Sequence, residues 1–215
     1  MLKVLANQNS LFHQFLKEMR DVDIQKDAMR FRRNIERVGE LMAYEISKTL
    51  DYREEEIKTP LGKAISRVPE RVVLANVLRA GLPLHQGLLN YFDNAENAFI
   101  SAYRKHTEGN DFEVEVEYMA APTLQDKIVV LADPMLATGT SMLLARQAIL
   151  KNGSPKHLHL VSVIASQFAV DKLQEELKGT NYTLWLGVVD ADLNDKSYII
   201  PGLGDAGDLA FGHKL

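Results

Sequence analysis

Five short apolar runs after residue 69 limit the possible folds more than any other feature of the sequence. They are rich in branched and aromatic side chains and cover residues 72–78, 98–103, 128–132, 159–164 and 183–189. Runs of this length without strict alternation indicate strands that are buried on both faces. Helical patterns at about 141–152 and 168–178 separate the last three runs. The sequence therefore predicts an α/β fold with a central parallel sheet flanked by helices.

Two further segments have different patterns. Residues from about 10 to 50 place Phe12 and Met19 at helical spacing and predict N-terminal helices. Within residues 104–122, apolar side chains alternate with glutamates from Phe112 to Tyr118, which is typical of an exposed antiparallel strand. We expect this segment to form a β-arm that projects from the sheet, with a turn at 108–111. It would act as a flap over an active site or as an oligomer contact.

Composition narrows the class of protein. The 215 residues suit one domain spanning 1–215, and a net charge of −4 argues against a surface that coats nucleic acid. The lack of cysteine excludes disulfides, thiolate nucleophiles and Cys-ligated metals. No apolar run reaches the roughly 20 residues of a membrane span, and the N-terminus lacks the apolar core of a secretion signal. We expect a soluble cytoplasmic protein without a membrane partner, and a nucleic-acid partner is not expected.

The segment from Asp133 to Ser141 is the strongest candidate for a ligand site. A buried strand ends at Asp133, a loop of small residues follows, and a helix begins near Ser141. Ligands of parallel sheets bind at the carboxyl ends of strands, and free N–H groups at a helix N-terminus attract anions. These features predict a phosphorylated ribose, with the phosphate on the loop and the hydroxyls near Asp133. An ordinary strand–helix turn capped by threonine or serine explains the same pattern equally well.

Three long motifs resemble one family of enzymes. The 133–141 loop is similar to the phosphoribosyl pyrophosphate (PRPP) loop of the type I phosphoribosyltransferases, in the form found in the uracil phosphoribosyltransferase branch. Residues 77–82 (VLRAGL) and 198–208 (YIIPGLGDAGD), the latter followed by Phe211-Gly212, resemble two further elements of that branch. Weaker similarity covers residues 20–45 and 103–104, so the resemblance spans nearly the whole chain in the right order.

The resemblance implies the type I phosphoribosyltransferase fold with a small C-terminal hood. It implies that uracil and PRPP react to give UMP and diphosphate. It also implies Mg²⁺ bound through the PRPP diphosphate with Asp205 near it through water, a homodimer or higher homo-oligomer, and GTP as an effector. The implied catalytic residues are Asp133, Arg104 and Asp205. The implied PRPP-binding residues are Arg79, Arg104, Asp133, Pro134, Met135, Leu136, Ala137, Thr138, Gly139, Thr140, Ser141 and Asp205. The implied uracil-binding residues, in the C-terminal loop at about 198–208, are Ile199, Gly204, Asp205 and Ala206.

Two positions depart from the family pattern. Thr140 stands where the family usually has glycine, and we expect phosphate binding to persist with an added hydroxyl contact. The arm ends in Tyr118-Met119-Ala120-Ala121-Pro122 and lacks the usual Lys and Leu. This second departure leaves the role of the flap and the control by GTP open.

Other functions fit the same fold. A non-catalytic nucleotide-sensing or RNA-binding regulator needs a basic face. The clearest basic cluster, Arg30, Arg32 and Arg33, is small and fits a solvated helix face better. Another base specificity conflicts with the C-terminal signature. Residues 202–207 also match the dinucleotide motif G-x-G-x-x-G, but the second strand and the acid that should follow have no room before Leu215.

Overall fold

The apolar runs of the sequence become the central strands of one sheet, as predicted. The computed structural model describes residues 1–106 and 112–213. In spatial order the strands are β1 (Leu2–Val4), β10 (Tyr182–Asp190), β9 (His157–Ser166), β7 (Ile128–Ala132), β4 (Val72–Leu78), β5 (Glu96–His106) and β6 (Phe112–Ala120), and β8 (Met135–Leu136) pairs with β9. The neighbours pair in parallel except β5 and β6, which are antiparallel. The predicted antiparallel strand is therefore confirmed, while its predicted turn at 108–111 lies outside the described residues.

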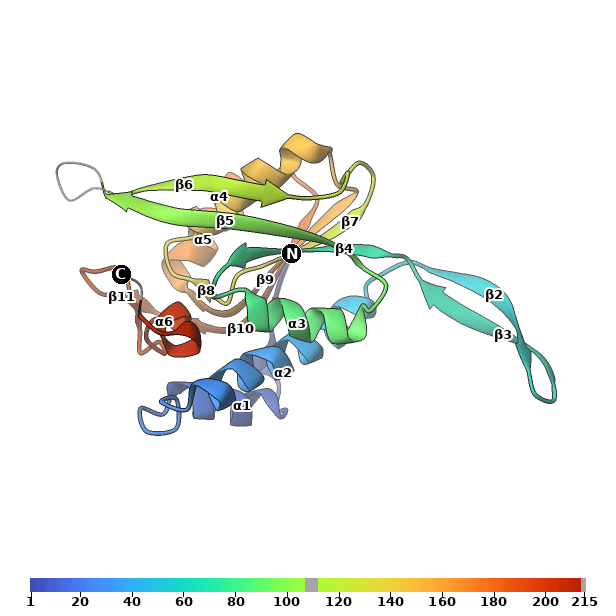
Figure 1. Cartoon of the computed structure of the whole chain (residues 1–215), viewed down its shortest axis with the longest axis horizontal. Coiled ribbons are helices and arrows are strands. Elements are labelled where there is room, and N and C mark those ends of the chain that lie inside the picture. The colour runs from blue at the N-terminus through green and yellow to red at the C-terminus, as the bar shows by residue number, and fades with distance from the viewer. Residues whose placement is uncertain (107–111, 214–215) are drawn as a thin grey trace.

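Helices cover both faces of the sheet (Figure 1). On one face lie α1 (Phe12–Arg20), α2 (Ala28–Ser47) and α3 (Leu82–Tyr91), and on the other lie α4 (Thr140–Ile149) and α5 (Gln167–Glu176). Because side chains alternate along a strand, Val72 and Leu74 of β4 join the first apolar core, whereas Val73 and Ala75 join the second. This two-sided burial is why the strands read as continuous apolar runs.

A hairpin of β2 (Tyr52–Thr59) and β3 (Gly62–Pro69) extends away from the body of the molecule (Figure 1). Nearly all of its side chains are exposed, so its sequence has no buried stripe. The sequence analysis did not predict this arm, because hydrophobic patterning finds a strand only through the face that it buries.

The remaining elements are short. A pair of two-residue strands, β11 (Asp192–Leu193) and β12 (Ile199–Ile200), precedes α6 (Ala206–Phe211), and the 3₁₀ turns are η1 (Leu5–Asn7) and η2 (Leu150–Asn152). The predicted N-terminal helices are confirmed as α1 and α2, which are separated by the turns at 21–27. Within the described ranges, none of the helices has the length and apolar character needed to cross a membrane.

Candidate functional site

The 133–141 loop connects the carboxyl end of β7 to α4. Met135 N donates a hydrogen bond to Asp133 Oδ1 over 3.3 Å, and Thr138 Oγ1 donates to Thr140 Oγ1 over 3.2 Å. Gly139 precedes the first residue of α4 at φ +73°, in the left-handed region that favours glycine. Among the described residues, no side chain caps this helix N-terminus. The alternative of a threonine- or serine-capped turn is therefore wrong here, and the terminal N–H groups suit an anion.

A second helix holds the 133–141 loop from outside. Ser166 Oγ, at the start of α5, donates to Ala137 O over 2.5 Å and accepts from Ala169 N. Farther along α5, Lys172 Nζ donates to Thr140 Oγ1 over 3.0 Å. The loop is thus hydrogen-bonded to α5 at two points, the carbonyl of Ala137 and the hydroxyl of Thr140.

Arg79 joins the 79–81 loop, which connects β4 to α3, to the C-terminal end of the chain. Its Nη2 donates to Gly212 O over 3.0 Å and lies 3.8 Å from Asp208 Oδ1. The Arg79 side chain is 41% exposed, so its guanidinium is accessible to a solute. The predicted diphosphate-binding arginine therefore lies at the C-terminal segment that carries the predicted base-binding motif.

That C-terminal segment, residues 202–208, also meets the 133–141 loop. Ala206 N donates to Met135 Sδ over 3.3 Å, and a Cβ placed on Gly207 would lie 3.9 Å from Ala80 Cβ. Asp205 caps α6 by accepting from Asp208 N over 3.0 Å. Three loops that are far apart in the sequence therefore converge at the carboxyl ends of β4 and β7, where parallel sheets bind ligands.

Some residues predicted for the site have side chains that belong to the core. Pro134 is buried, and its carbonyl accepts from Val163 N and Ile164 N, while Leu136 packs under α4 and α5. Ile199 is 4% exposed and packs into the core on the α2 face. The binding roles of these residues stay predictions. Because their side chains are buried, only their backbone groups could contact a ligand. Arg104 lies on β5, and its side chain is outside the described part of the structure.

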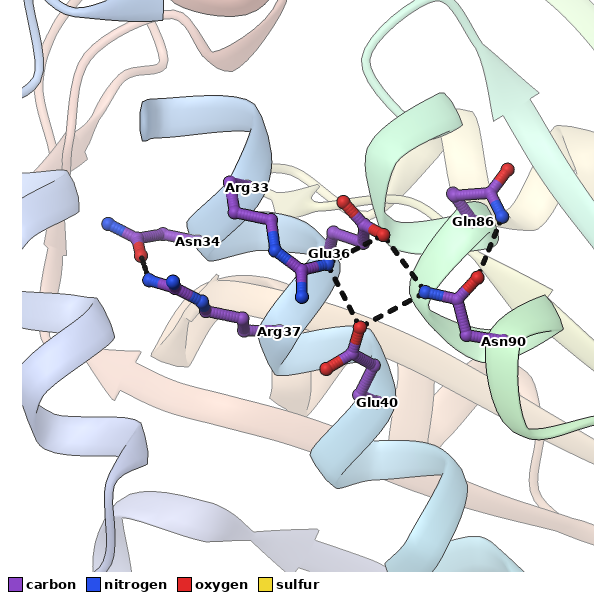
Figure 2. A network of polar contacts seen from close by, with 7 residues as sticks. All are labelled: Arg33, Asn34, Glu36, Arg37, Glu40, Gln86 and Asn90. Carbon is purple, nitrogen blue, oxygen red and sulfur yellow. Dashed lines mark hydrogen bonds and ion pairs between the residues drawn. The ribbon is translucent and has the colours of Figure 1, made fainter. Parts of the chain in front are cut away.

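A network of polar contacts joins α2 to α3, the helix that follows the 79–81 loop (Figure 2). Its Glu36 and Glu40 accept hydrogen bonds from Asn90 of α3 over 2.9 and 3.0 Å, and both carboxylates pair with Arg33. The two helices approach closely because Gly87 lies against the carbonyl of Glu36.

The arginines of the basic cluster on α2 pair with glutamates or contact α6. Arg30 pairs with Glu18 over 3.2 Å, as a solvated face would, and Arg33 pairs within α2. Arg32 departs from the prediction of a solvated face, because its Nη1 donates to Ala210 O of α6 over 2.6 Å. The side chain therefore holds the C-terminal helix against α2.

Three charged residues at the site were not predicted from the sequence. They are Lys172, which contacts the 133–141 loop, Asp208, which lies near Arg79, and Asp190, whose Oδ2 accepts from Gly202 N over 2.9 Å. Lys172 and Asp190 lie on elements that the sequence identifies only by their apolar pattern. Asp208 lies inside the quoted 198–208 motif, which was its only signal.

Comparisons with known proteins agree with this geometry. The family model for uracil phosphoribosyltransferase matches residues 6–213. A uracil phosphoribosyltransferase of Porphyromonas gingivalis is 55% identical over 212 residues, covering 98% of each chain. One of Methanothermobacter thermautotrophicus is 41% identical over 190 residues, covering 86% of this chain and 85% of the relative.

Solved structures show the same fold. The protein AQ2163 of Aquifex aeolicus superposes with a TM-score of 0.86 at 33% identity, over 99% of this chain and 98% of that one. A hypoxanthine phosphoribosyltransferase of Staphylococcus aureus superposes with a TM-score of 0.50 at 15% identity, over 86% and 84% of the two chains. The second likeness supports the fold alone.

Proposed function

The chain belongs to the uracil phosphoribosyltransferase family, and from this premise we propose how its three site loops bind the two substrates. The enzyme is a pentosyltransferase that converts uracil and PRPP to UMP and diphosphate. The observation that best supports this arrangement of the two substrates is the 3.3 Å contact between Ala206 N and Met135 Sδ. It joins the motif assigned to the base to the motif assigned to PRPP.

The 5′-phosphate of PRPP binds at the start of α4. The N–H groups from Thr138 to Ser141 belong to a helix N-terminus that, in the described structure, has no side-chain cap. The hydroxyl groups of Thr140 and Ser141 add donors, and Thr138 Oγ1 donates to Thr140 Oγ1. Gly139 keeps the loop tight enough for the backbone to reach the anion.

Asp133 binds the ribose, and two arginines bind the leaving diphosphate. Positive charge develops on the ribose ring as the anomeric C–O bond breaks, so a carboxylate beside the ring stabilises the transition state. Arg79 exchanges its contact with Gly212 for the diphosphate, and Arg104 supplies a second guanidinium. No covalent intermediate with the protein is required.

Magnesium fits this site as a partner of the diphosphate rather than as a resident ion. Among the residues that the structure describes, no group of three or more His, Asp or Glu side chains could hold a metal ion. Mg²⁺ is commonly bound by one or two carboxylates together with substrate phosphates, and Asp205 and Asp133 are the carboxylates on the site loops. When bound, the ion would neutralise charge on the leaving group.

The base binds at the backbone of the C-terminal segment. Gly204 is exposed at φ +90°, and Ala206, two residues farther on, donates its N–H to Met135 of the 133–141 loop. Uracil offers two carbonyl acceptors and one N–H donor, which main-chain groups complement. An exocyclic amine that faces a backbone N–H has no acceptor there, so cytosine is rejected.

The test is diphosphate release from PRPP and Mg²⁺ with uracil, cytosine, hypoxanthine or orotate, with identification of the nucleotide formed. We expect UMP with uracil and no product with the other bases. The substitution Asp133→Asn should lower kcat by about 100-fold, the usual effect of removing one group that stabilises transition-state charge. Asp93→Asn, at an exposed residue after α3, is the matched control and should leave kcat unchanged.

Each outcome separates the claims. Unchanged kcat in Asp133→Asn, with UMP still formed by the wild type, would refute the ribose assignment but not the activity. UMP binding without turnover of any base would instead support the non-catalytic regulator. Adding GTP to the same assay tests the effector expected from the family, and fractionation of cells tests the cytoplasmic location.

The hairpin β2–β3 is the proposed contact of a homodimer. It exposes Ile57, Leu61 and Ile65 on a two-stranded arm, and an isolated hairpin of this kind is marginally stable in water. Its glutamates are balanced by basic residues of the paired strand, as in the 2.6 Å pair of Glu56 and Lys63. Little net charge therefore opposes packing of the arm on a second copy of the chain.

A further inference from the structure

A lysine from α5 lies at the 133–141 loop. Lys172 Nζ donates a hydrogen bond to Thr140 Oγ1 over 3.0 Å, and Thr138 Oγ1 donates to the same oxygen over 3.2 Å. The Lys172 side chain is half-buried. The positive charge of Lys172 is thus bonded directly to a hydroxyl group of the loop that is proposed to bind the 5′-phosphate.

The packing of α5 fixes this lysine in place. A Cβ on Gly139 would lie 2.4 Å from Leu173 Cδ1 and 3.7 Å from Ala169 Cβ, so α5 lies directly against the loop. The start of α5 is bound to the loop as well, through Ser166. Lys172 is three residues beyond Ala169 and therefore lies near it on the helix surface.

Among the residues whose side chains the structure describes, 1–101 and 118–213, no carboxylate forms an ion pair with Lys172. The carboxylate of the adjacent Asp171 accepts instead from Gln167 over 2.8 Å. A half-buried ammonium group gains most from an anion that shares its low-dielectric surroundings.

Thr140 connects the ammonium group to the ligand. Its hydroxyl oxygen accepts from both Lys172 and Thr138, so its own proton remains to be donated. The acceptor within reach of a residue at the first turn of α4 is the phosphate proposed to bind there. A glycine at position 140 would offer neither the acceptor for Lys172 nor this donor.

We propose that Lys172 is a phosphate-binding residue, which recognises the 5′-phosphate of PRPP and of UMP together with Thr140. The inference rests on the proposed function, because it requires the phosphate to bind at the 133–141 loop. The lysine acts on the phosphate that does not react, so it raises affinity for the phosphorylated ribose rather than the rate of bond breaking.

The test compares two ligands that share a charge type but occupy different parts of the site. Ribose 5-phosphate carries only the 5′-phosphate, whereas inorganic diphosphate occupies only the leaving-group position. By titration calorimetry, Lys172→Met should weaken ribose 5-phosphate and UMP about tenfold, the size of one charge-assisted hydrogen bond. Diphosphate affinity should not change. In steady-state kinetics the KM for PRPP should rise while kcat is retained.

Control variants separate charge from structure. Lys172→Arg keeps the charge and should retain most of the affinity. Lys178→Met removes an exposed lysine just after α5 and should leave all affinities unchanged. Thr140→Gly and Lys172→Met should be non-additive for ribose 5-phosphate, because the two groups act on one phosphate.

Three results would overturn the proposal. If Thr138→Ala and Ser141→Ala weaken ribose 5-phosphate while Lys172→Met does not, the loop binds phosphate without the lysine. If Lys172→Met weakens ribose 5-phosphate and diphosphate equally, Lys172 has a structural role only. If none of these variants changes ribose 5-phosphate affinity, the phosphate assignment of the loop itself is wrong.

Discussion

The guanidinium of Arg20 and the carboxylate of Asp190 lie 2.7 Å apart, although 170 positions separate them in the chain. Asp190 is 7% exposed, and its other oxygen accepts from Gly202 N over 2.9 Å. Gly202 has φ +60°, and a Cβ there would lie 2.0 Å from Ile199 O. One buried carboxylate therefore ties the end of α1 and the end of β10 to the segment proposed to bind uracil.

Asp190→Asn tests whether this pair positions the base-binding segment. The amide keeps the shape but leaves Arg20 without its counter-charge, so we expect a loss of about 3 kcal/mol in the free energy of unfolding. The KM for uracil should rise about tenfold while the KM for PRPP hardly changes, because the segment that Asp190 holds is the one proposed to contact the base. Denaturant unfolding and kinetics with each substrate varied measure these effects.

The matched control for Asp190→Asn is the exposed pair of Asp23 and Lys26, 2.9 Å apart. Asp23→Asn should change neither stability nor either KM, since exposed pairs contribute little. Equal increases of both KM values in Asp190→Asn would contradict a specific effect on the base.

The close contact of α2 and α3 predicts that Gly87→Ala is strongly destabilising. A Cβ at position 87 would lie 1.9 Å from Glu36 O and 2.9 Å from Gly39 Cα, so the helices must separate. We expect a loss of about 3 kcal/mol in the free energy of unfolding, as for overpacking of a core. Because α3 follows the 79–81 loop, the KM for PRPP should rise as well.

The hydrogen bonds across the same two helices should matter much less (Figure 2). Asn90→Ala removes the bonds to Glu36 and Glu40, but Asn90 is exposed and water can replace it. The expected loss is about 0.5 kcal/mol. A larger loss in Asn90→Ala than in Gly87→Ala would show that the polar network, not the backbone contact, joins the helices.

The sheet was predictable because burial on both faces leaves a signal in the sequence. The runs at 72–78 and 128–132 match β4 and β7, since all residues of these strands except Asn76 and Leu78 belong to one of the two apolar cores. The hairpin of residues 52–69 was missed because it buries almost nothing. Its strands are fixed by cross-strand pairing and not by an apolar stripe.

The candidate site was predictable only where its residues form contiguous motifs. The 133–141 loop and the 202–208 segment are local in sequence, and turn chemistry and resemblance reveal them. Lys172 and Asp190 join the site through packing of α5 and through a long-range ion pair. Such contacts leave no spacing pattern, because the distance along the chain is set by the topology.

The buried His159 should make stability depend on pH. Its Nδ1 accepts from Trp185 Nε1 over 3.0 Å, and burial, assisted by the neighbouring His157, lowers the pKa of His159 from 6.5 to about 3. The unfolded chain therefore binds a proton that the folded chain excludes, so this stability is fully present above pH 6.5 and is lost as the pH falls. The expected loss between pH 7.5 and 5 is about 2 kcal/mol.

Denaturant unfolding at pH 7.5, 6 and 5 measures this loss. In His159→Gln the slope of the free energy of unfolding against pH should fall by about the equivalent of one proton. The glutamine amide cannot titrate, and its oxygen still accepts from Trp185. His13→Gln, at an exposed position of α1, is the control and should keep the wild-type slope. An identical slope in His159→Gln would contradict the assignment.

The hairpin makes a prediction about assembly. Leu61 is fully exposed at its tip, and Ile57 and Ile65 are 41% and 64% exposed, on a two-stranded arm that cannot cover them itself. Burial of such side chains on a second chain contributes about 25 cal/mol for each Å² of apolar surface, which favours a dimer. The wild type should therefore have twice the 24.2 kDa chain mass by light scattering.

Replacing these three residues by threonine or serine should give the monomer mass, because the apolar contact is lost while the strands still pair. Val22→Ser, at a residue that is 69% exposed near α1, is the control and should leave the dimer intact. If the dimer survives the hairpin substitutions, the dimer interface is formed by another part of the chain.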